Sequence, residues 1–133
     1  MSVYESKLNI NSESFAKNRQ DQLKNIELLN TLRERTTAAS EKRRARFEER
    51  GQLTPRDRLA ILLDPGMPFL ELYNVAGYGV DDPNPETSLI GSSTIGGIGF
   101  VNGVRCMIYV DDSGINAGAA MELTFKKGIE CLK

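Results

Sequence analysis

The first third of the sequence places apolar residues at helical spacing between polar stretches. From residue 13 to residue 38 they recur three or four positions apart, or at a multiple of this, so they fall on one face of a helix. They are Phe15, Leu23, Ile26, Leu29 and Leu32. The pattern predicts one long helix with a narrow apolar stripe. Because so narrow a stripe cannot form a core alone, the helix should lie across another part of the chain or a partner.

Two further helices are predicted next. A charged run over residues 40–50 ends at Gly51, and glycine commonly follows the last turn of a helix. Thr54 offers an N-terminal cap for the following helix, and Pro55 suits its first turn because no backbone donor is required there. Residues 64–66, Asp-Pro-Gly, should end it. The buried edge of this helix should consist of Leu59, Leu62 and Leu63.

A short strand and a long loop should follow. Residues 69–73 alternate well enough between apolar and polar for a strand. Residues 77–92 contain Gly, Pro, Asn and Asp at a density typical of loops, and we expect a mobile surface excursion there. Asp81 and Asp82 lie within it. Because aspartate side chains commonly accept hydrogen bonds from turn amides, we interpret both as turn residues and not as metal ligands.

The next segment predicts a hairpin with strands over residues 93–100 and 105–110. Asn102-Gly103 suits the positive φ angles of a two-residue turn. Glycines at 96, 97 and 99 weaken the first strand, which suggests that another backbone or a ligand comes close. No helix follows these glycines, so strand curvature explains them better than a nucleotide-binding loop does. The second strand is apolar without alternation, as expected when both faces are covered.

A glycine-rich bend then leads to a helix predicted from about Ala119 onward. Asp111 and Asp112 precede the bend, and neighbouring residues of an extended segment point to opposite faces. They therefore do not form an acid/base pair, and Asp112 or Ser113 should instead accept hydrogen bonds from backbone amides. Small residues over 114–120 would let a ligand approach free N–H groups at the helix start. The alternative is a tight connection without a ligand, and the spacing leaves both open.

Composition limits the chemistry available to this chain. Its 133 residues, 40% of them hydrophobic, suffice for one modest core. A formal net charge of −1 argues against broad nucleic-acid binding. The absence of histidine removes the commonest general base and most zinc sites. We accordingly predict no metal ligand within the chain, and composition alone points to no catalytic residue.

The sequence is typical of a cytoplasmic protein. No apolar stretch is long enough to cross a bilayer, and the first residues do not resemble a secretory or organelle leader. Cys106 and Cys131 should be free thiols that act as small apolar residues. The basic run over 42–46 should be a solvated helix face, balanced by neighbouring glutamates. One or two of its arginines remain available to a phosphate-bearing cofactor.

Several ordered motifs resemble those of the carboxyltransferase β subunits of biotin-dependent acyl-CoA carboxylases. These proteins share an Arg-rich helix, a short turn, a second helix and a Leu-Leu-Asp-Pro-Gly stop before a Phe-x-Glu strand. The matching segments here are Arg50-Gly51-Gln52-Leu53, Arg56-Asp57-Arg58-Leu59 and Leu62-Leu63-Asp64-Pro65-Gly66. The hairpin over 95–108, with its Val-Asn-Gly centre, is also similar, and Arg105-Cys106-Met107-Ile108 favours the methylcrotonyl-CoA and geranyl-CoA branch.

The resemblance implies an α/β architecture of the crotonase-like type. It would be a partial fold with N-terminal helices, a β-hairpin and a strand-loop-helix unit. Residues 1–53 would form an N-terminal helical segment, and residues 54–133 an incomplete carboxyltransferase N-subdomain. The family's Gly-Gly-Ala oxyanion element follows the next strand, beyond this sequence. We therefore expect the scaffold without a complete catalytic constellation.

The resemblance also implies partners and a substrate. The family transfers a carboxyl group from carboxybiotin, carried on a partner domain, to an acyl-CoA, without a metal, and backbone N–H groups stabilise the enolate and the oxyanion. Expected partners are the biotin carboxylase or biotin carrier subunit, the remaining part of the carboxyltransferase and further copies of the full-length form, but neither nucleic acid nor membrane. Acyl-CoA would contact Gly114, Gly118, Ala119 and Ala120, where Ala119 replaces the second glycine common in the family.

Two functions remain open from the sequence. The chain would be the N-terminal part of an acyl-CoA carboxyltransferase subunit. Alternatively, it would be a truncated, non-catalytic paralogue that serves as an assembly or acyl-CoA-binding module.

Overall fold

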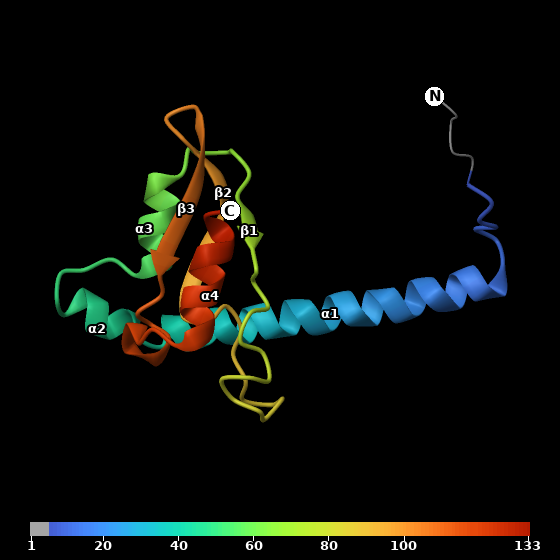
Figure 1. The fold of residues 1–133 in the computed structure, drawn as a ribbon, viewed down its shortest axis with the longest axis horizontal. Helices are drawn as coiled ribbons and strands as arrows, with labels where there is room; N and C mark the ends of the chain where they lie inside the picture. Colours follow the sequence, from blue (N-terminus) through green and yellow to red (C-terminus); the bar gives the residue numbers. More distant parts are fainter. Residues whose placement is uncertain (1–5) are drawn as a thin grey trace. The chain divides into compact units, whose positions relative to one another are not determined.

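The computed structural model describes residues 6–133, which form helices and one three-stranded sheet (Figure 1). The chain divides into two compact units, residues 1–31 and residues 32–133, and the sheet lies in the second unit. The elements are α1 (Glu13–Glu41), α2 (Arg44–Glu48), α3 (Pro55–Leu62), β1 (Leu70–Leu72), β2 (Thr94–Val101), β3 (Val104–Asp111), the 3₁₀ turn η1 (Asn116–Gly118) and α4 (Glu122–Cys131).

The predicted N-terminal helix is confirmed and is longer than expected. It continues to Glu41, so the following helix α2 is correspondingly short. Within the first unit Leu23, Ile26 and Leu29 have exposed fractions of 44–52%. The apolar stripe therefore faces solvent over these turns. Leu32, the first residue of the second unit, is buried.

The hairpin follows the predicted geometry. β2 pairs antiparallel with β3 and, on its other side, with β1. Asn102 and Gly103 have φ angles of 50° and 77°, as a two-residue turn requires. Asp64, which follows α3, accepts hydrogen bonds from the backbone N atoms of both turn residues at 2.7 Å. Asp64, the residue predicted to end α3, thus also fixes the hairpin turn between β2 and β3.

The glycines of β2 permit close packing on both faces of the sheet. A Cβ on Gly97 would lie 2.5 Å from the Leu70 carbonyl oxygen, and one on Gly96 would lie 2.8 Å from the Cys131 sulfur. Successive strand residues point to opposite faces, so α3 and the Phe69 side chain pack on one face of the sheet and α4 on the other. The core between α3 and the sheet contains Leu59, Ile95 and Ile108, with Leu63 and Phe69 beside it.

Three expectations about burial were wrong. β3 is covered on one face only, because Ile108 is 6% exposed while Met107 and Tyr109 are each 41% exposed. Leu62 is 48% exposed, since only Leu59 and Leu63, four residues apart, face the sheet. The third, the surface excursion over 77–92, was wrong in part: residues 78–80 and 83–87 form an exposed loop, but Ser88, Ile90 and Ser92 are buried.

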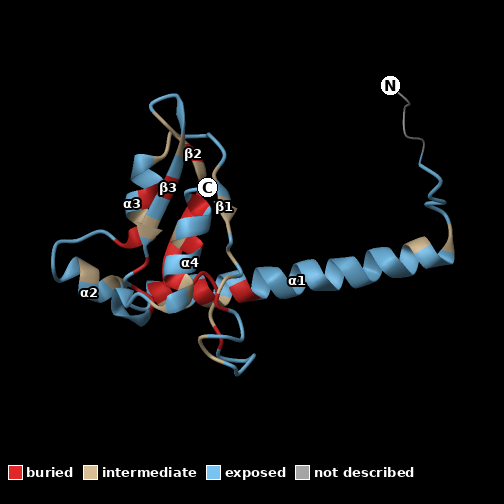
Figure 2. Ribbon diagram, in the orientation of Figure 1, coloured by how far each residue is buried: buried red, intermediate tan, exposed pale blue. Residues whose placement is uncertain are grey.

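Two residues of α1 that belong to the second unit, Arg35 and Thr36, bind that loop. Arg35 donates to the carbonyls of Pro85 and Ser88, and the Thr36 hydroxyl accepts from the Ile90 backbone N at 3.0 Å. Ser88 and Ile90 are accordingly buried (Figure 2). Asp82 performs the predicted turn role, because its carboxylate accepts from Asn84 N and the Thr87 hydroxyl.

The last helix begins later than predicted and is oriented unexpectedly. α4 starts at Glu122 and not near Ala119, because Ala117 and Gly118 have positive φ angles that break the helical path. Its buried residues are Thr124, Lys127 and Cys131. Its large apolar residues Phe125, Ile129 and Leu132 are 56–85% exposed. The helix therefore buries two polar residues, Thr124 and Lys127, while its large apolar residues Phe125, Ile129 and Leu132 face solvent.

We predict that Asp64→Ala destabilises the second unit through the hairpin turn. The substitution leaves two backbone N–H groups without their side-chain acceptor, which should lower the free energy of unfolding by about 1–3 kcal/mol. Urea unfolding followed by circular dichroism would measure this. Asp111→Ala, at the exposed last position of β3, should change stability by less than about 0.5 kcal/mol. Equal effects of the two substitutions would contradict the role given to Asp64.

Candidate functional site

A buried carboxylate organises the bend between β3 and α4. Asp112 is 3% exposed and accepts from the Ser40 hydroxyl at 2.7 Å and from Gly114 N at 3.1 Å. Its own backbone N donates to the Ser93 carbonyl. Asp111 is exposed, so the two carboxylates do not act as a pair. The predicted capping role of Asp112 is confirmed.

The four residues predicted to contact acyl-CoA do not share one surface. Gly114 is buried, and a Cβ there would collide with Ser40, so packing explains this glycine. Gly118 is exposed, and its φ of 77° favours glycine. Ala119 and Ala120 are exposed and line two different cavities. The acyl-CoA contact of these residues stays a prediction.

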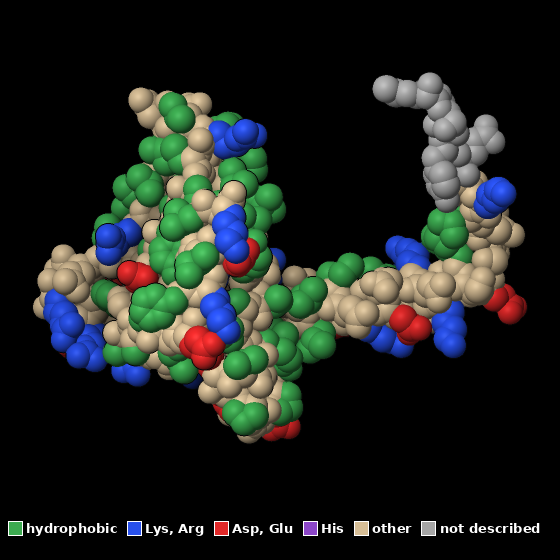
Figure 3. Space-filling view, viewed as in Figure 1, with side chains coloured by type: hydrophobic (Ala, Val, Ile, Leu, Met, Phe, Trp, Pro, Cys, Tyr) green, Lys and Arg blue, Asp and Glu red, His purple; other side chains and the backbone are tan. Residues whose placement is uncertain are grey.

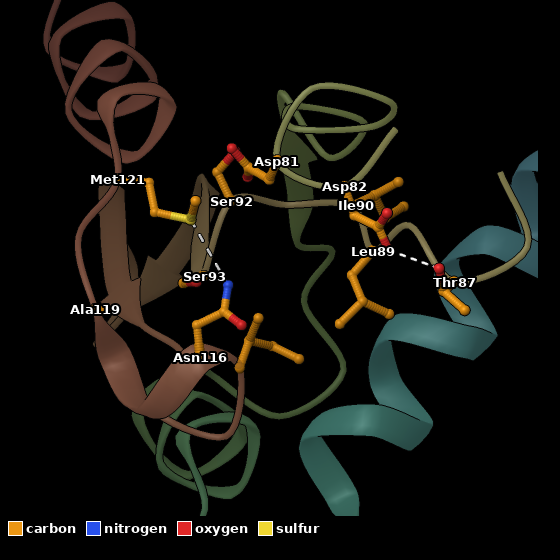
Figure 4. A pocket seen from close by; sticks show the side chains of 11 residues that line it. Asp81, Asp82, Thr87, Leu89, Ile90, Ser92, Ser93, Asn116, Ala119 and Met121 are labelled. Atoms are coloured by element: carbon orange, nitrogen blue, oxygen red, sulfur yellow. Dashed lines mark hydrogen bonds between the residues drawn. The ribbon is translucent and has the colours of Figure 1, made fainter. Parts of the chain in front are cut away.

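Ala119 opens onto a cavity of about 420 Å³ between the loop that precedes β2 and the bend that follows β3 (Figure 4). We call this the bend cavity. It is lined by Asp81, Asp82, Thr87, Leu89, Ile90, Ser92, Ser93, Ile115, Asn116, Ala119 and Met121. The lining therefore combines carboxylates, hydroxyls and one carboxamide with apolar side chains.

Two serines of the bend cavity were not anticipated from the sequence. Ser92 and Ser93 are each 4% exposed, and their hydroxyl oxygens have no hydrogen-bond partner among the described residues. Their φ angles of 49° and 59° lie in the left-handed region, which is strained for residues other than glycine. In the sequence they look like ordinary loop serines, because no pattern of neighbouring residues indicates that they are buried or that their φ angles are positive.

A buried lysine ties α4 to the turn that carries these serines and to the first residue of β2. Lys127 is 3% exposed, and its Nζ donates to the carbonyls of Gly91 at 3.2 Å and Thr94 at 2.7 Å. The Thr124 hydroxyl donates to the Ser92 carbonyl at 2.8 Å. Burial lowers the pKa of Lys127 from its ordinary value, mainly because the charged form loses water.

A second, smaller cavity collects arginines on the other side of the bend. Arg43, Arg46 and Arg50 line about 170 Å³ together with Phe47, Gln52, Ser113 and Ala117. We call this the arginine cavity. Arg44 does not line it, because its guanidinium binds Glu41 and Asp57, which raises the pKa of Arg44 and lowers that of Asp57. The basic run therefore divides into one paired arginine and two that face a cavity.

A third cavity, of about 500 Å³, is mainly apolar. It runs between β3 and the outward face of α4, and its lining includes Met107, Tyr109, Ala120, Phe125 and Ile129. Figure 3 shows hydrophobic side chains gathered over this part of the molecule. We call this the α4 groove.

The described residues also limit other site types. Among residues 6–133 no group of three or more Cys, Asp or Glu side chains could hold a metal ion. None of the helices in this part of the chain is long and apolar enough to span a membrane. Cys106 and Cys131 are free thiols, as expected.

Comparison with known proteins identifies the family. The carboxyl transferase domain model matches residues 46–132. The chain belongs to the carboxyl transferase domain family. A 3-methylcrotonyl-coenzyme A carboxylase β1 subunit of Mycobacterium tuberculosis is 40% identical over 102 residues, which is 76% of this chain and 18% of that protein. A mitochondrial methylcrotonoyl-CoA carboxylase β chain of Arabidopsis thaliana is 33% identical over 88% of this chain and 19% of its own length.

Solved structures confirm the crotonase-like carboxyltransferase fold. The geranyl-CoA carboxylase β subunit of P. aeruginosa superposes with a TM-score of 0.84 and 38% identity, over 98% of this chain and 24% of that one. The transcarboxylase 12S core superposes with a TM-score of 0.66 at 24% identity, which supports the fold alone. The chain thus spans less than a quarter of the length of these relatives.

We predict that Lys127 makes stability depend on pH. Because burial holds its pKa below 10.5 in the folded chain, the unfolded chain binds more protons between the lowered pKa and 10.5. The free energy of unfolding should therefore rise with pH across this window, and Lys127→Met should remove that rise. Urea unfolding at a series of pH values would measure both slopes.

Lys126→Met provides the matched control for this experiment. Lys126 is the preceding residue of α4, and its side chain is 63% exposed. In Lys126→Met the free energy of unfolding should therefore rise with pH as steeply as it does in the wild type. Equal slopes for the wild type and Lys127→Met would show that burial of Lys127 has no such effect.

Proposed function

We propose that this chain forms the N-terminal, acyl-CoA-side part of the carboxyltransferase of a biotin-dependent acyl-CoA carboxylase. The carboxyl group would leave the ring nitrogen of carboxybiotin and form a new C–C bond with the acyl-CoA, whose carbon loses a proton. Similarity to the geranyl-CoA carboxylase β subunit over 98% of the chain supports this proposal. We favour a methylcrotonyl-CoA-like or geranyl-CoA-like substrate, because relatives with these names match most of the chain.

The arginine cavity is the observation that carries the substrate side of the proposal. Coenzyme A bears phosphates, and guanidinium groups bind phosphate through charge-assisted hydrogen bonds. Arg43, Arg46 and Arg50 surround a cavity that also touches Ser113 and Ala117 of the glycine-rich bend. Phosphates bound there would bring the rest of the coenzyme close to Gly118 and Ala119. The proposed acyl-CoA contacts and the basic run would then serve one ligand.

The α4 groove supports a partner within the same enzyme. α4 buries Thr124 and Lys127 and exposes Phe125 and Ile129, the reverse of an isolated surface helix. β3 is paired with β2 only, so its other edge is unpaired among the described residues. We propose that the remaining part of the carboxyltransferase covers this face, and that the full-length form is a homo-oligomer.

The other proposed partner is the biotin carrier. Relatives are named as subunits of biotin-dependent carboxylases, so carboxybiotin would arrive on a biotin carrier or biotin carboxylase subunit. Bound biotin would supply the carboxyl group, while this chain would contribute neutral hydrogen-bonding residues such as Ser92 and Ser93. The bend cavity would receive the uncharged biotin ring, because its lining combines polar and apolar residues and includes no lysine or arginine. We propose a cytoplasmic location, in which the free thiols of Cys106 and Cys131 stay reduced.

We predict that Arg43→Ala and Arg46→Ala each weaken binding of coenzyme A by about tenfold, the loss expected for one charge-assisted hydrogen bond. Isothermal titration calorimetry would measure the Kd, with dephospho-coenzyme A as a second ligand to locate the 3′-phosphate. Arg105→Ala, at an exposed β3 position outside the cavity, is the matched control and should bind like the wild type. Unchanged affinity in both cavity variants would refute phosphate binding there.

We predict that carboxyl transfer requires the rest of the carboxyltransferase. The 133-residue chain alone should not transfer carboxyl from carboxybiotin to methylcrotonyl-CoA or geranyl-CoA. Addition of a polypeptide that covers the unmatched part of the geranyl-CoA carboxylase β subunit should produce turnover. Phe125→Asp should prevent this association, because it places a charge in the α4 groove.

Each outcome of that experiment separates two functions. Turnover only in the mixture supports the carboxyltransferase. Association or coenzyme A binding without turnover favours the non-catalytic assembly or acyl-CoA-binding module, to which the exposed apolar face of α4 is equally suited. Turnover by the chain alone would refute the claim that its catalytic constellation is incomplete.

A further inference from the structure

The two walls of the arginine cavity come from segments that are far apart in the sequence. Arg43, Arg46 and Arg50 belong to the segment around α2, whereas Ser113 and Ala117 belong to the bend after β3. In the part of the chain that the structure describes, no backbone hydrogen bond joins these arginines to the two bend residues. The spacing of the walls is therefore set by residues that do not line the cavity.

Ser40 and Asp112 connect the two walls through buried contacts. The Ser40 hydroxyl donates to Asp112 Oδ1 at 2.7 Å, and the two residues are 5% and 3% exposed. The Ser40 carbonyl accepts from Arg43 N at 3.0 Å, and Asp112 directly precedes Ser113. Ser40 thus contacts an arginine of one wall and the neighbour of Ser113 in the other. We call this connection the Ser40–Asp112 link.

The residue after Ser113 is held by the same link. Gly114 N donates to Asp112 Oδ1 at 3.1 Å. A Cβ on Gly114 would lie 2.9 Å from both Cα and the carbonyl oxygen of Ser40, so the backbone of the bend packs directly on α1. Asp112 N donates to the Ser93 carbonyl at 2.8 Å, which fixes the carboxylate from its own backbone. Both neighbours of Ser113 are therefore fixed relative to α1.

Ser113 is the lining residue that depends most on this backbone position. It is exposed and carries the only hydroxyl group in the lining of the arginine cavity. An arginine has a long side chain that can adjust to a ligand, whereas a serine hydroxyl moves only by rotation about χ1. Because O–H···O bonds span a narrow range of distances, a displacement of the bend by about 1 Å would break a bond from Ser113 to a ligand.

We propose that Asp112 is a positioning residue for phosphate binding in the arginine cavity. Through Ser40 and Gly114 it holds the Ser113 hydroxyl where this group donates to a phosphate that the arginines bind. Asp112 does not contact the ligand, because its carboxylate is buried and already accepts from two donors. This inference rests on the proposed function, which places the phosphates of coenzyme A in this cavity.

Isothermal titration calorimetry of the 133-residue chain with adenosine 3′,5′-bisphosphate tests the proposal. Asp112→Ala removes the acceptor of the link and Ser40→Ala removes its donor, so each should weaken binding about tenfold. Asp112→Asn should stay within about threefold of the wild type, because its amide oxygen can accept both hydrogen bonds. Tighter binding by Asp112→Asn than by the wild type would show that the carboxylate repels the phosphate, and would overturn the proposal.

Thr36→Ala is the matched control for a loss of stability. Thr36 lies one turn before Ser40 on α1, is 6% exposed, and accepts from Ile90 N at 3.0 Å. Its replacement should lower the Tm, as Ser40→Ala does, but should leave the Kd for the bisphosphate unchanged, because Ile90 lies outside the arginine cavity. Equal losses of affinity in Thr36→Ala and Ser40→Ala would overturn the proposal.

A double-mutant cycle tests whether the link acts through Ser113. Ser113→Ala alone should weaken binding about tenfold, and its combination with Ser40→Ala should weaken binding no further than Ser40→Ala alone. Losses that add would show that Ser40 acts independently of Ser113 and would refute the positioning role. Ser40→Ala also keeps the test decisive if Asp112→Ala does not fold, since it leaves the carboxylate in place.

The outcomes separate this inference from the proposed function. Wild-type affinity in Ser40→Ala, together with weakened binding in Arg43→Ala, would defeat only the positioning role of Asp112. Failure of the wild-type chain to bind the bisphosphate would defeat the phosphate site of the proposed function, and this inference with it.

Discussion

The second unit depends on the close approach of neighbouring elements to β2. Gly96, Gly97 and Gly99 carry no side chain, so Phe69 and Leu63 pack closely on one face of this strand and Cys131 on the other. A methyl group at any of these positions would overlap an atom of a neighbour. The weak strand propensity of glycine is offset by packing that larger residues would prevent. Both cavities beside the glycine-rich bend rely on the frame built in this way.

Polar anchors then fix the bend and the last helix to that frame. Asp112 joins β3 to Ser40 of α1, and Lys127 joins α4 to the carbonyls of Gly91 and Thr94. The free energy gained from the two carbonyl hydrogen bonds of Lys127 is largely offset by the cost of removing its charge from water. The lysine therefore adds little to the stability of the fold, but it fixes the position of α4 relative to the start of β2. The same anchoring turns the apolar side of α4 outward. This exposed apolar side of α4 is the surface that we propose for the remaining part of the carboxyltransferase.

The two ligand cavities lie on either side of one backbone bend but differ in charge. Arginines from the segment around α2 supply one, while carboxylates and serines from the loop before β2 supply the other. Ser113 and Ala117 line the arginine cavity, and Asn116 and Ala119 line the bend cavity. Neighbouring residues of the bend thus line cavities of different charge. A coenzyme with charged and neutral portions suits such a division.

The sequence alone determined the elements with local signals. The Thr54 cap, the Asn102-Gly103 turn, the capping role of Asp112 and the family motifs depend on neighbours a few residues away. Only the tertiary structure decided which residues became buried. Ser92 and Ser93 are buried without partners among the described residues, and Leu62 stays exposed. Thr124 and Lys127 of α4 are buried because they bind carbonyls more than 30 residues away, which no local pattern predicts. Burial depends on contacts between residues that are far apart in the sequence, so a short segment of sequence does not determine it.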